Sequence, residues 1–248
     1  MTLAGSVDAI EVADRVYRIG TRWANFYLVV DGGDAVLVDA GYPGYLARLR
    51  ACAEAVGVGL GGIRGVIVTH HHVDHAGAAE AVRGESGAQV FVGANDVSKV
   101  RGDEKSHPPQ GFWREWWRPS MIAYLVHSAR VGGSNYQPVE AVSPIEYEQM
   151  LDLPGRPRVF GTPGHTAGHH SVALAERGVV FTGDALVNFD YASGKAGLSL
   201  HRFNEDRVRA TASLALLEDV EAETLLFGHG DPWHGDVKVA LEEVRAGL

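Results

Sequence analysis

The chain has 248 residues, of which 46% are hydrophobic and 21% charged, and its formal net charge is −9. These proportions are ordinary for a globular protein with a sizeable core. The acidic balance argues against a general polyanion binder, because no basic excess is left to neutralise phosphate groups. The single cysteine, Cys52, excludes an internal disulfide framework and a zinc site built from cysteines.

No part of the sequence approaches about 18 uninterrupted apolar residues, so we expect no transmembrane helix. Residues 1–14 lack the basic head and apolar run of a secretory signal. We therefore expect a cytoplasmic protein that acts on a small-molecule substrate and binds neither nucleic acid nor a membrane.

The first half of the chain is expected to alternate strands and helices after an opening hairpin. Clusters of β-branched and aromatic residues predict strands at residues 16–20, 26–31, 35–38, 65–68 and 89–92. A helix is expected over residues 46–56, where apolar residues share one stripe, and another over 76–83, ended by Gly84. This alternation favours a layered α/β fold.

Residues 102–149, here called the aromatic insertion, interrupt the alternation. Trp113, Trp116 and Trp117 have the spacing that places side chains on one side of a helix. A second helical piece is expected to begin at Pro119, a residue well suited to the first turn of a helix.

Regular structure is expected to return after the insertion. Strands are predicted at residues 158–160, 171–174, 179–182 and 223–227. A polar loop is expected over residues 186–201, followed by a helix from the N-cap Asn204 to Asp219. A last helix is predicted over residues 236–245.

The heptapeptide at residues 69–75, with the sequence THHHVDH, directly follows an apolar run. Imidazole and carboxylate groups are the usual ligands of zinc and similar ions. Alternate side chains of an extended backbone point the same way, so His70 and His72 can converge on one point. Asp74 and His75 can face a neighbouring point, with His71 as a spacer. The alternative is a surface histidine tract, which needs no further ligands elsewhere.

Three later strand ends carry a ligand-type residue beside glycine. They are His165 in the sequence PGHT, Asp184 in TGD and His229 in FGH. Strand ends of a layered α/β fold collect at one edge of the sheets, where active sites form. Each motif alone is a weak signal. With the heptapeptide they supply five histidines and two aspartates, which is enough for two metals.

This series of motifs, which begins at the turn Val38-Asp39-Ala40-Gly41, resembles the metallo-β-lactamase superfamily over nearly the whole chain. The resemblance implies a four-layer αβ/βα sandwich in which residues 1–248 form a single domain. It also implies two divalent metal ions, zinc or alternatively iron or manganese. The implied ligands of the first metal are His70, His72 and His165, those of the second are Asp74, His75 and His229, and Asp184 bridges both.

The same resemblance implies a role for Asp39, which would orient a ligand histidine through its other ring nitrogen. Two neighbouring metals lower the pKa of a bridging water, and the resulting hydroxide attacks an ester-like carbonyl or a phosphorus. Asp74 could orient this nucleophile or move a proton to the leaving group. One of His169 and His170 could reach the residues behind the ligands.

The histidine at position 72, rather than glutamate, resembles the hydrolase branch and differs from the flavin-linked di-iron reductases. The two histidine motifs are similar to those of glyoxalase II and the acyl-homoserine lactonases. The short stretch after His229 has no counterpart of the helical glyoxalase II domain that binds the glutathione thioester. The lactonase tyrosine falls at Val187, and the nearest tyrosine is Tyr191. Neither specific substrate is therefore carried over.

The aromatic insertion is predicted to determine specificity as a lid over the metals. The expected pocket residues are Trp113, Trp116, Trp117, Met121, Tyr124, Tyr191 and His201. Alternatively, the tryptophans pack against the chain's own core or form a homodimer contact, because aromatic stripes at helical spacing usually bury against protein.

Four hypotheses of function follow. The leading one is a binuclear metal-dependent hydrolase of a small ester, thioester or lactone. Alternatives within the same superfamily are a mononuclear iron dioxygenase similar to the persulfide dioxygenases, and a phosphodiesterase. The last hypothesis is a non-catalytic scaffold whose tryptophan-rich segment binds a partner.

Overall fold

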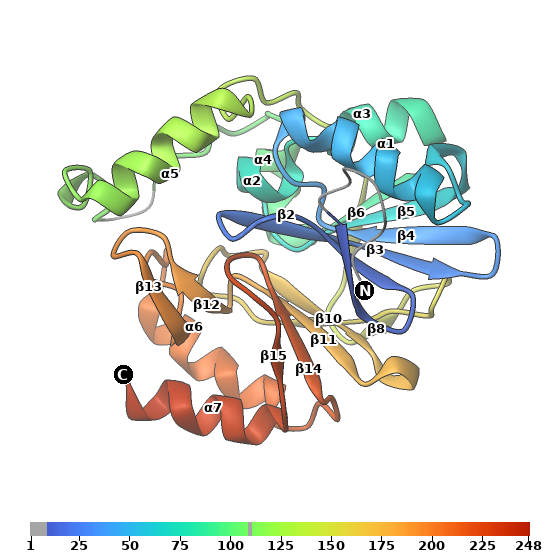
Figure 1. The fold of residues 1–248 in the computed structure, drawn as a ribbon. Coiled ribbons are helices and arrows are strands. Elements are labelled where there is room, and N and C mark those ends of the chain that lie inside the picture. Colours follow the sequence, from blue (N-terminus) through green and yellow to red (C-terminus); the bar gives the residue numbers. More distant parts are fainter. Residues whose placement is uncertain (1–8, 109–110) are drawn as a thin grey trace.

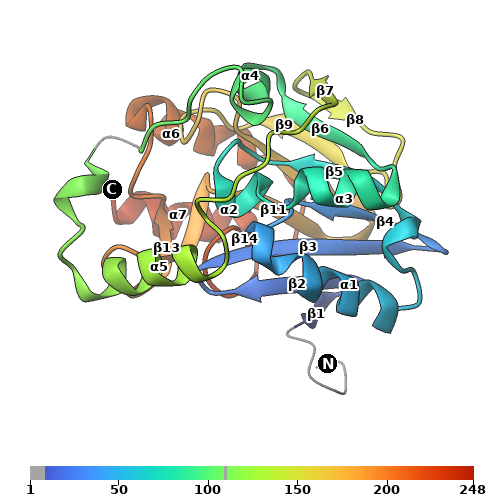
Figure 2. The same ribbon diagram turned by 90° about the horizontal axis from the view of Figure 1, so that it is seen from above.

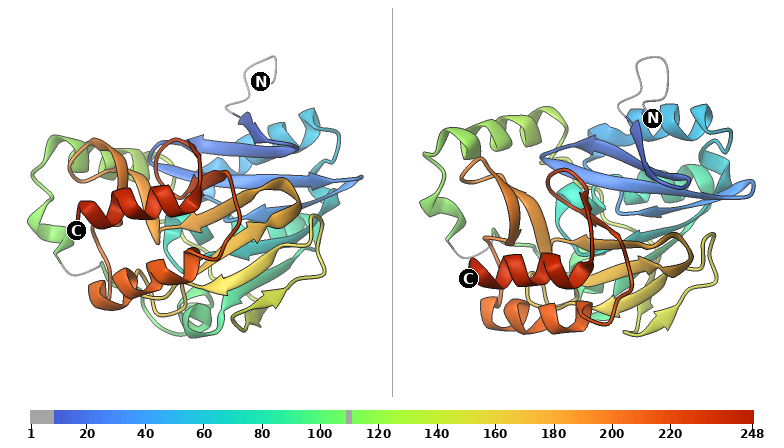
Figure 3. Two further views of the ribbon diagram at one scale, coloured as in Figure 1. Left: turned by 90° about the horizontal axis from the view of Figure 1, so that it is seen from below. Right: turned by 60° about the horizontal axis from the view of Figure 1, so that its bottom comes forward.

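Two β-sheets face each other, and helices cover the outer face of each (Figure 1). The computed structural model describes residues 9–108 and 111–248. The helices α1 (Leu46–Ala55) and α3 (Ala79–Ser86) lie on the first sheet, as seen from above in Figure 2. The helices α6 (Arg207–Ser213) and α7 (Val237–Ala246) lie side by side on the second (Figure 3). The four-layer αβ/βα sandwich expected from the sequence is confirmed.

The first sheet has seven strands in sequence order, β1 to β7. Its first four strands are antiparallel neighbours, and β4 to β7 run parallel to one another. The strands are β1 (Ala9–Ala13), β2 (Val16–Thr21), β3 (Ala24–Asp31), β4 (Asp34–Val38), β5 (Ile63–Val68), β6 (Gln89–Gly93) and β7 (Val142–Ile145).

The second sheet has the order β15-β14-β11-β10-β9-β8, in which β11 and β14 are parallel neighbours. Its strands are β8 (Gln149–Met150), β9 (Arg158–Gly161), β10 (His170–Leu174), β11 (Val179–Gly183), β14 (Thr224–Phe227) and β15 (Trp233–His234). A separate hairpin consists of β12 (Leu186–Asp190) and β13 (Lys195–Leu200).

The core between the two sheets consists mainly of valine, isoleucine and leucine side chains with two aromatic rings. Val36 and Ile67 of the first sheet belong to the same buried cluster as Val172, Phe181 and Leu226 of the second. Two further clusters fill the spaces between each sheet and its helices. Because both faces are covered, the central strands are apolar runs instead of alternating patterns, and these runs made them predictable.

Several predicted boundaries are wrong. The helix expected over residues 76–83 is two helices, α2 (Val73–Ala76) and α3. They meet at Gly77, where a Cβ would lie 2.3 Å from the carbonyl oxygen of Val73. Helix α3 runs through Gly84 and ends before Gly87, whose φ of 74° suits a left-handed cap.

Two predictions in the second half are also wrong. The hairpin β12–β13 occupies most of the segment predicted to be a polar loop. The N-cap of α6 is Asp206, which accepts a hydrogen bond from the Arg209 N–H, and not Asn204. The helix ends at Ser213 and continues as a 3₁₀ turn, Leu214–Leu217, short of Asp219.

The aromatic insertion contains no continuous tryptophan helix. A 3₁₀ turn, Phe112–Arg114, follows Gly111, and helix α5 (Pro119–Arg130) begins at the predicted proline. This helix lies beside the β12–β13 hairpin (Figure 1), and its Met121 and Tyr124 join a buried cluster with Phe189 of that hairpin. Strand β7 of the insertion pairs with β6 in the first sheet. Among the described residues, no helix is long and apolar enough to span a membrane.

Candidate metal centre

The heptapeptide lies at the C-terminal end of the central parallel strand β5 and turns into α2. His70 and His75 are fully buried, and Asp74 is 5% exposed. His72 precedes α2 with an extended backbone, so its side chain does not follow the helical direction of the residues after it. The turn thus separates the ligand-type side chains into two pairs, as the sequence predicts.

The second sheet contributes three more buried side chains from the ends of its strands. His165 follows β9, Asp184 follows β11 and His229 follows β14. Because β11 and β14 are parallel neighbours, their ends lie side by side, and the His229 Nε2 lies 3.0 Å from the Asp184 Oδ2. Ligand-type residues from both sheets therefore meet at one edge of the sandwich.

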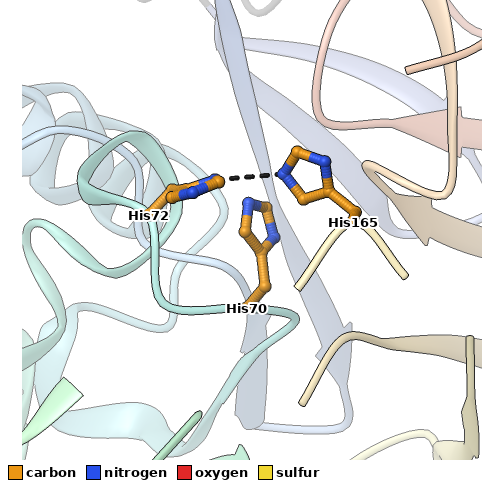
Figure 4. A group of neighbouring side chains, drawn as sticks. All are labelled: His70, His72 and His165. Carbon is orange, nitrogen blue, oxygen red and sulfur yellow. Dashed lines mark hydrogen bonds between the residues drawn. The ribbon is translucent and has the colours of Figure 1, made fainter. Parts of the chain in front are cut away.

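The first group consists of His70, His72 and His165, whose ligand atoms all lie within 4.8 Å of one another. Figure 4 shows the three rings pointing toward one another, with the His165 Nε2 and the His72 Nδ1 3.0 Å apart. The second group consists of Asp74, His75 and His229, with the same spacing of ligand atoms.

Asp184 lies between the two groups. Its Oδ1 is 3.5 Å from the His75 Nε2 of the second group. Its Oδ2 is 3.5 Å from the Nε2 of His165 and 3.9 Å from that of His70, both in the first group. One carboxylate thus lies near ligand atoms of both groups.

The donor atoms fit a divalent cation. Within the described part of the chain, the buried Nε2 atoms of His70 and His75 and the Oδ1 of Asp184 have no hydrogen-bond partner. A buried unpaired polar atom costs about 1–3 kcal/mol, so three that converge are expected to share a ligand. Unprotonated imidazole and carboxylate are donors that zinc and related ions accept.

Residues behind the donors fix the orientation of two rings. The Asp39 Oδ2 lies 2.8 Å from the His75 Nδ1, which holds a proton on Nδ1 and directs Nε2 toward Asp184. Asp39 also accepts hydrogen bonds from the Thr69 N–H and hydroxyl, and its φ of 60° is unusual for a residue other than glycine. The His229 Nδ1 similarly lies 2.5 Å from the carbonyl oxygen of Trp23.

His169, and not His170, contacts Asp184 from behind. The Asp184 N–H donates to the His169 Nε2 over 2.9 Å. The His169 Nδ1–H then donates to the Thr162 hydroxyl, which lies 2.9 Å from that of Ser171. This buried chain of hydrogen bonds holds the loop that carries Asp184.

Asp96 is a functional residue that the sequence reasoning missed. Its buried carboxylate accepts hydrogen bonds from the Thr166 hydroxyl and the backbone N–H groups of Gly168 and His71. Burial raises the pKa of Asp96, but its contacts with His71, Thr166 and Gly168 outweigh this effect and hold the pKa below its usual range. Asp96 therefore joins the heptapeptide to the loop of His165. The only sequence signal was its place shortly after a predicted strand.

The electrostatics differ between the two groups. Removal from water and the neighbouring imidazoles hold the pKa values of His70 and His165 well below the ordinary value. These rings are therefore unprotonated at neutral pH, the form that binds metal. Burial also lowers the pKa of His75, but Asp184, Asp39 and Asp74 outweigh it and raise this pKa to about 10.

A cavity of about 560 Å³ opens onto both groups. Tyr124 and Tyr191 line it, as predicted. Their rings stack with centroids 4.1 Å apart, and the Tyr124 hydroxyl donates to the Asp74 Oδ2 over 3.1 Å. Burial and the charge of Asp74 raise the pKa values of both tyrosines, so their hydroxyls remain hydrogen-bond donors.

The other predicted pocket residues lie elsewhere. Trp113, Trp116 and Trp117 are 63%, 58% and 61% exposed and are not among the residues that line the cavity. Met121 is buried beneath the cavity wall. The homodimer contact through the tryptophans remains a prediction.

His201, an expected pocket residue, is buried beside the two ligand groups. Its Nε2 is 3.5 Å from the Asp184 Oδ2, and its ring packs edge-on against that of His165, with centroids 4.4 Å apart. His165, Asp184 and His201 form another group with metal-ligand spacing.

Known proteins resemble this chain over most of its length. A probable metallo-hydrolase of Bacillus subtilis, YflN, is 27% identical over 253 residues, which cover 95% of this chain and 91% of that protein. A hydroxyacylglutathione hydrolase of Rhodospirillum rubrum is 27% identical over 188 residues, which cover 75% of this chain but only 55% of that protein. A solved metallo-beta-lactamase family protein of Thermus thermophilus has a TM-score of 0.67 at 27% identity, and the match covers 94% of this chain and 79% of that one.

The sequence profile of the metallo-beta-lactamase superfamily matches residues 20–229. This range begins in β2 and includes every residue of both ligand groups. The superfamily and the names of the relatives indicate a metallo-hydrolase. The chain belongs to the metallo-β-lactamase superfamily.

Proposed function

We propose that the chain is a binuclear metal-dependent hydrolase that cleaves a small ester, thioester or lactone. The observation that carries this proposal is the position of Asp184 between two complete ligand groups. A single structural metal would need only one of the groups. Two groups that share a carboxylate are the arrangement expected of a hydrolytic pair of metals.

His70, His72 and His165 would hold one ion, Asp74, His75 and His229 the other, and Asp184 would contact both. Zinc is the ion we expect, with iron or manganese as alternatives. When bound, such a pair supplies a nucleophilic water at neutral pH and a positive charge near the developing oxyanion. The chain's own side chains would bind the substrate and transfer protons.

Asp74 and Tyr191 are the side chains that we assign to substrate and proton handling. Asp74 faces the cavity while the Tyr124 hydroxyl holds its Oδ2, so its orientation is fixed before substrate enters. Its carboxylate is placed to accept the proton of the attacking water and to pass it to the leaving group. The protonated Tyr191 hydroxyl can donate a hydrogen bond to the substrate from the same wall.

The cavity supports an ester-like substrate with an apolar portion. Val73, Phe112, Leu125 and Tyr136 contribute apolar or aromatic surface to its lining. Such surface favours an acyl or alcohol group without charge. The name of the Rhodospirillum rubrum relative agrees with thioester hydrolysis, but the chain spans only about half of that protein.

The test combines metal analysis with a panel of substrates. Purified protein should contain close to two equivalents of metal per chain and hydrolyse at least one aliphatic lactone, aryl ester or thioester. A chelator should remove both the metal and the activity, and adding zinc should restore them. As a control, Asp34→Asn, at a partly exposed residue that does not line the cavity, should change neither quantity.

Three outcomes would overturn the proposal. Protein reconstituted with zinc, iron or manganese that hydrolyses no member of the panel would exclude this function. Oxygen consumption with a persulfide substrate, at one iron per chain, would instead identify a dioxygenase. Turnover of phosphodiesters alone would instead identify a phosphodiesterase.

A further inference from the structure

One wall of the cavity is a loop that no metal ligand belongs to. It follows helix α4 (Val97–Val100), and its residues Gly102, Glu104, Lys105, Ser106, His107 and Pro108 line the cavity. The wall consists of residues 102–108. Four residues of the two metal groups, His72, Asp74, His165 and His229, line the same cavity, and so does Asp184.

The first part of this wall is held by α4. The backbone N–H groups of Asp103 and Glu104 donate to the carbonyl oxygen of Ser98, and the Ser98 hydroxyl donates to the Glu104 carboxylate. Residues 105–108, the second part of the wall, make fewer hydrogen bonds. Within the part of the chain that the structure describes, their only hydrogen bond joins the Ser106 Oγ to the His71 Nε2 over 3.1 Å.

His71, the partner of Ser106 in this hydrogen bond, is itself held in position. The His71 side chain is 1% exposed, and its Nδ1 lies 3.2 Å from the Oδ2 of the fully buried Asp96. The His71 backbone N–H donates to the same Asp96 oxygen over 3.1 Å, and the His71 Nε2 and the Ser106 hydroxyl share a hydrogen bond at the opposite side of the ring. Asp96 is in turn held by Thr166 and Gly168. The hydroxyl therefore binds a ring whose position is fixed from behind.

The position of His71 in the chain connects the wall to the metal centre. His71 stands between His70 and His72 in the heptapeptide, so the wall is attached to the segment that supplies two donors of the first group. The sequence predicts only a spacer at His71, and the structure gives it two polar contacts outside the metal groups. A substrate bound at Asp184 would extend between this wall and the apolar side chains of Phe112 and Leu125.

We propose that Ser106 is a specificity-determining residue. Its hydrogen bond to His71 holds residues 105–108 at a set distance from Phe112 and Leu125, and this distance selects the non-reacting apolar group of the substrate. The inference rests on the proposed hydrolase function. The apolar acyl or alcohol portion of the substrate would occupy the space between the wall and these two side chains. The bond that is hydrolysed would lie at the metal groups.

The kinetic test compares Ser106→Ala with Ser106→Thr, which keeps the hydroxyl. The probes are 4-nitrophenyl acetate, too short to reach the wall, and 4-nitrophenyl octanoate. Loss of one hydrogen bond predicts that Ser106→Ala raises the KM for the octanoate by about three- to tenfold. We expect kcat, the KM for the acetate and the metal content to stay unchanged, and Ser106→Thr to behave like the wild type.

A second readout does not depend on metal or activity. Trypsin cleaves after Lys105, so its cleavage rate in metal-free protein reports how firmly the wall is held. We expect Ser106→Ala to be cleaved at Lys105 at least about three times faster than the wild type, and Ser106→Thr at the wild-type rate. Mass spectrometry identifies the cleavage site.

The two readouts separate the possible failures. Equal KM values for the octanoate in wild type and Ser106→Ala, or equal cleavage at Lys105, would overturn the role of Ser106. A parallel rise of both KM values would overturn it as well, because the effect would not be selective. Lack of hydrolysis by the wild type would refute the proposed function, and the cleavage rates would still decide whether Ser106 holds the wall.

Discussion

Gly228 precedes His229 and packs against two proposed ligands of the metal centre. A Cβ on Gly228 would lie 2.2 Å from the Asp184 Oδ1 and 2.4 Å from the His75 Cε1. The backbone cannot easily move away, because the Gly228 N–H donates to the Gly183 carbonyl oxygen and its own carbonyl oxygen accepts from the Asn25 N–H. The substitution Gly228→Ala should therefore displace the two side chains.

The displacement can be estimated from ordinary contact distances. Van der Waals contact begins at 3.4 Å, so the Asp184 oxygen must retreat by 3.4 − 2.2 = 1.2 Å and the His75 carbon by 3.4 − 2.4 = 1.0 Å. Metal–ligand distances tolerate changes of only about 0.2 Å. Substitution of a residue that only supports a ligand lowers metal affinity by up to roughly 100-fold. Because Gly228→Ala moves proposed ligands directly, we expect a larger loss of affinity.

The assay is competition with a chromophoric chelator, together with metal analysis after dialysis. Gly228→Ala should lose at least one of the two expected equivalents of metal. The matched control is Gly84→Ala in α3, where a Cβ meets nothing within 4 Å; it should keep both metals and gain about 0.5–1 kcal/mol of stability. Wild-type metal content in folded Gly228→Ala would refute the reasoning.

Three further outcomes are expected. Tyr124→Phe removes a hydrogen bond to the Asp74 carboxylate that contributes about 1.5–3 kcal/mol. Chelator competition should therefore show a roughly 10- to 150-fold loss of metal affinity. An unchanged affinity would contradict the contact. Asp39→Asn no longer fixes the proton on the His75 Nδ1, so metal affinity should fall about 10–100-fold while the far-ultraviolet circular dichroism stays the same. The pKa of His75, raised to about 10 from an ordinary 6.5, means that its protonated ring stabilises the metal-free fold below pH 6.5 and that this contribution is lost as the pH rises through 10. Thermal melts of metal-free protein should therefore show stability falling more steeply between pH 6.5 and 10 in the wild type than in His75→Gln, and parallel curves would contradict this assignment.

The parts of the site that depend on local pattern could be predicted from the sequence. An apolar strand followed by glycine and a ligand-type residue places that residue at a sheet edge, which is why His165, Asp184 and His229 meet the heptapeptide. The role of Asp39 was implied by the family resemblance alone, and the structure places Asp39 directly after β4, where it accepts a hydrogen bond from Thr69 at the end of β5.

Contacts between distant segments could not be predicted in this way. Asp96 contacts His71, which is 25 positions earlier, and Thr166, which is 70 positions later, and nothing near Asp96 in the sequence marks either partner. The prediction of a tryptophan helix was wrong for another reason. Helical spacing alone says nothing about whether a segment between Gly111 and Pro119 is long enough to form a helix.

The division of the proposed ligands between the two sheets has a consequence for the whole molecule. The first sheet supplies His70, His72, Asp74 and His75, and the second supplies His165, Asp184 and His229, so bound metal would cross-link the two sheets. A ligand that binds only the folded state adds about 2.7 kcal/mol of stability at a free concentration of 100 times its Kd. As free metal falls below its Kd, the protein would lose its nucleophile and the cross-link between its sheets together.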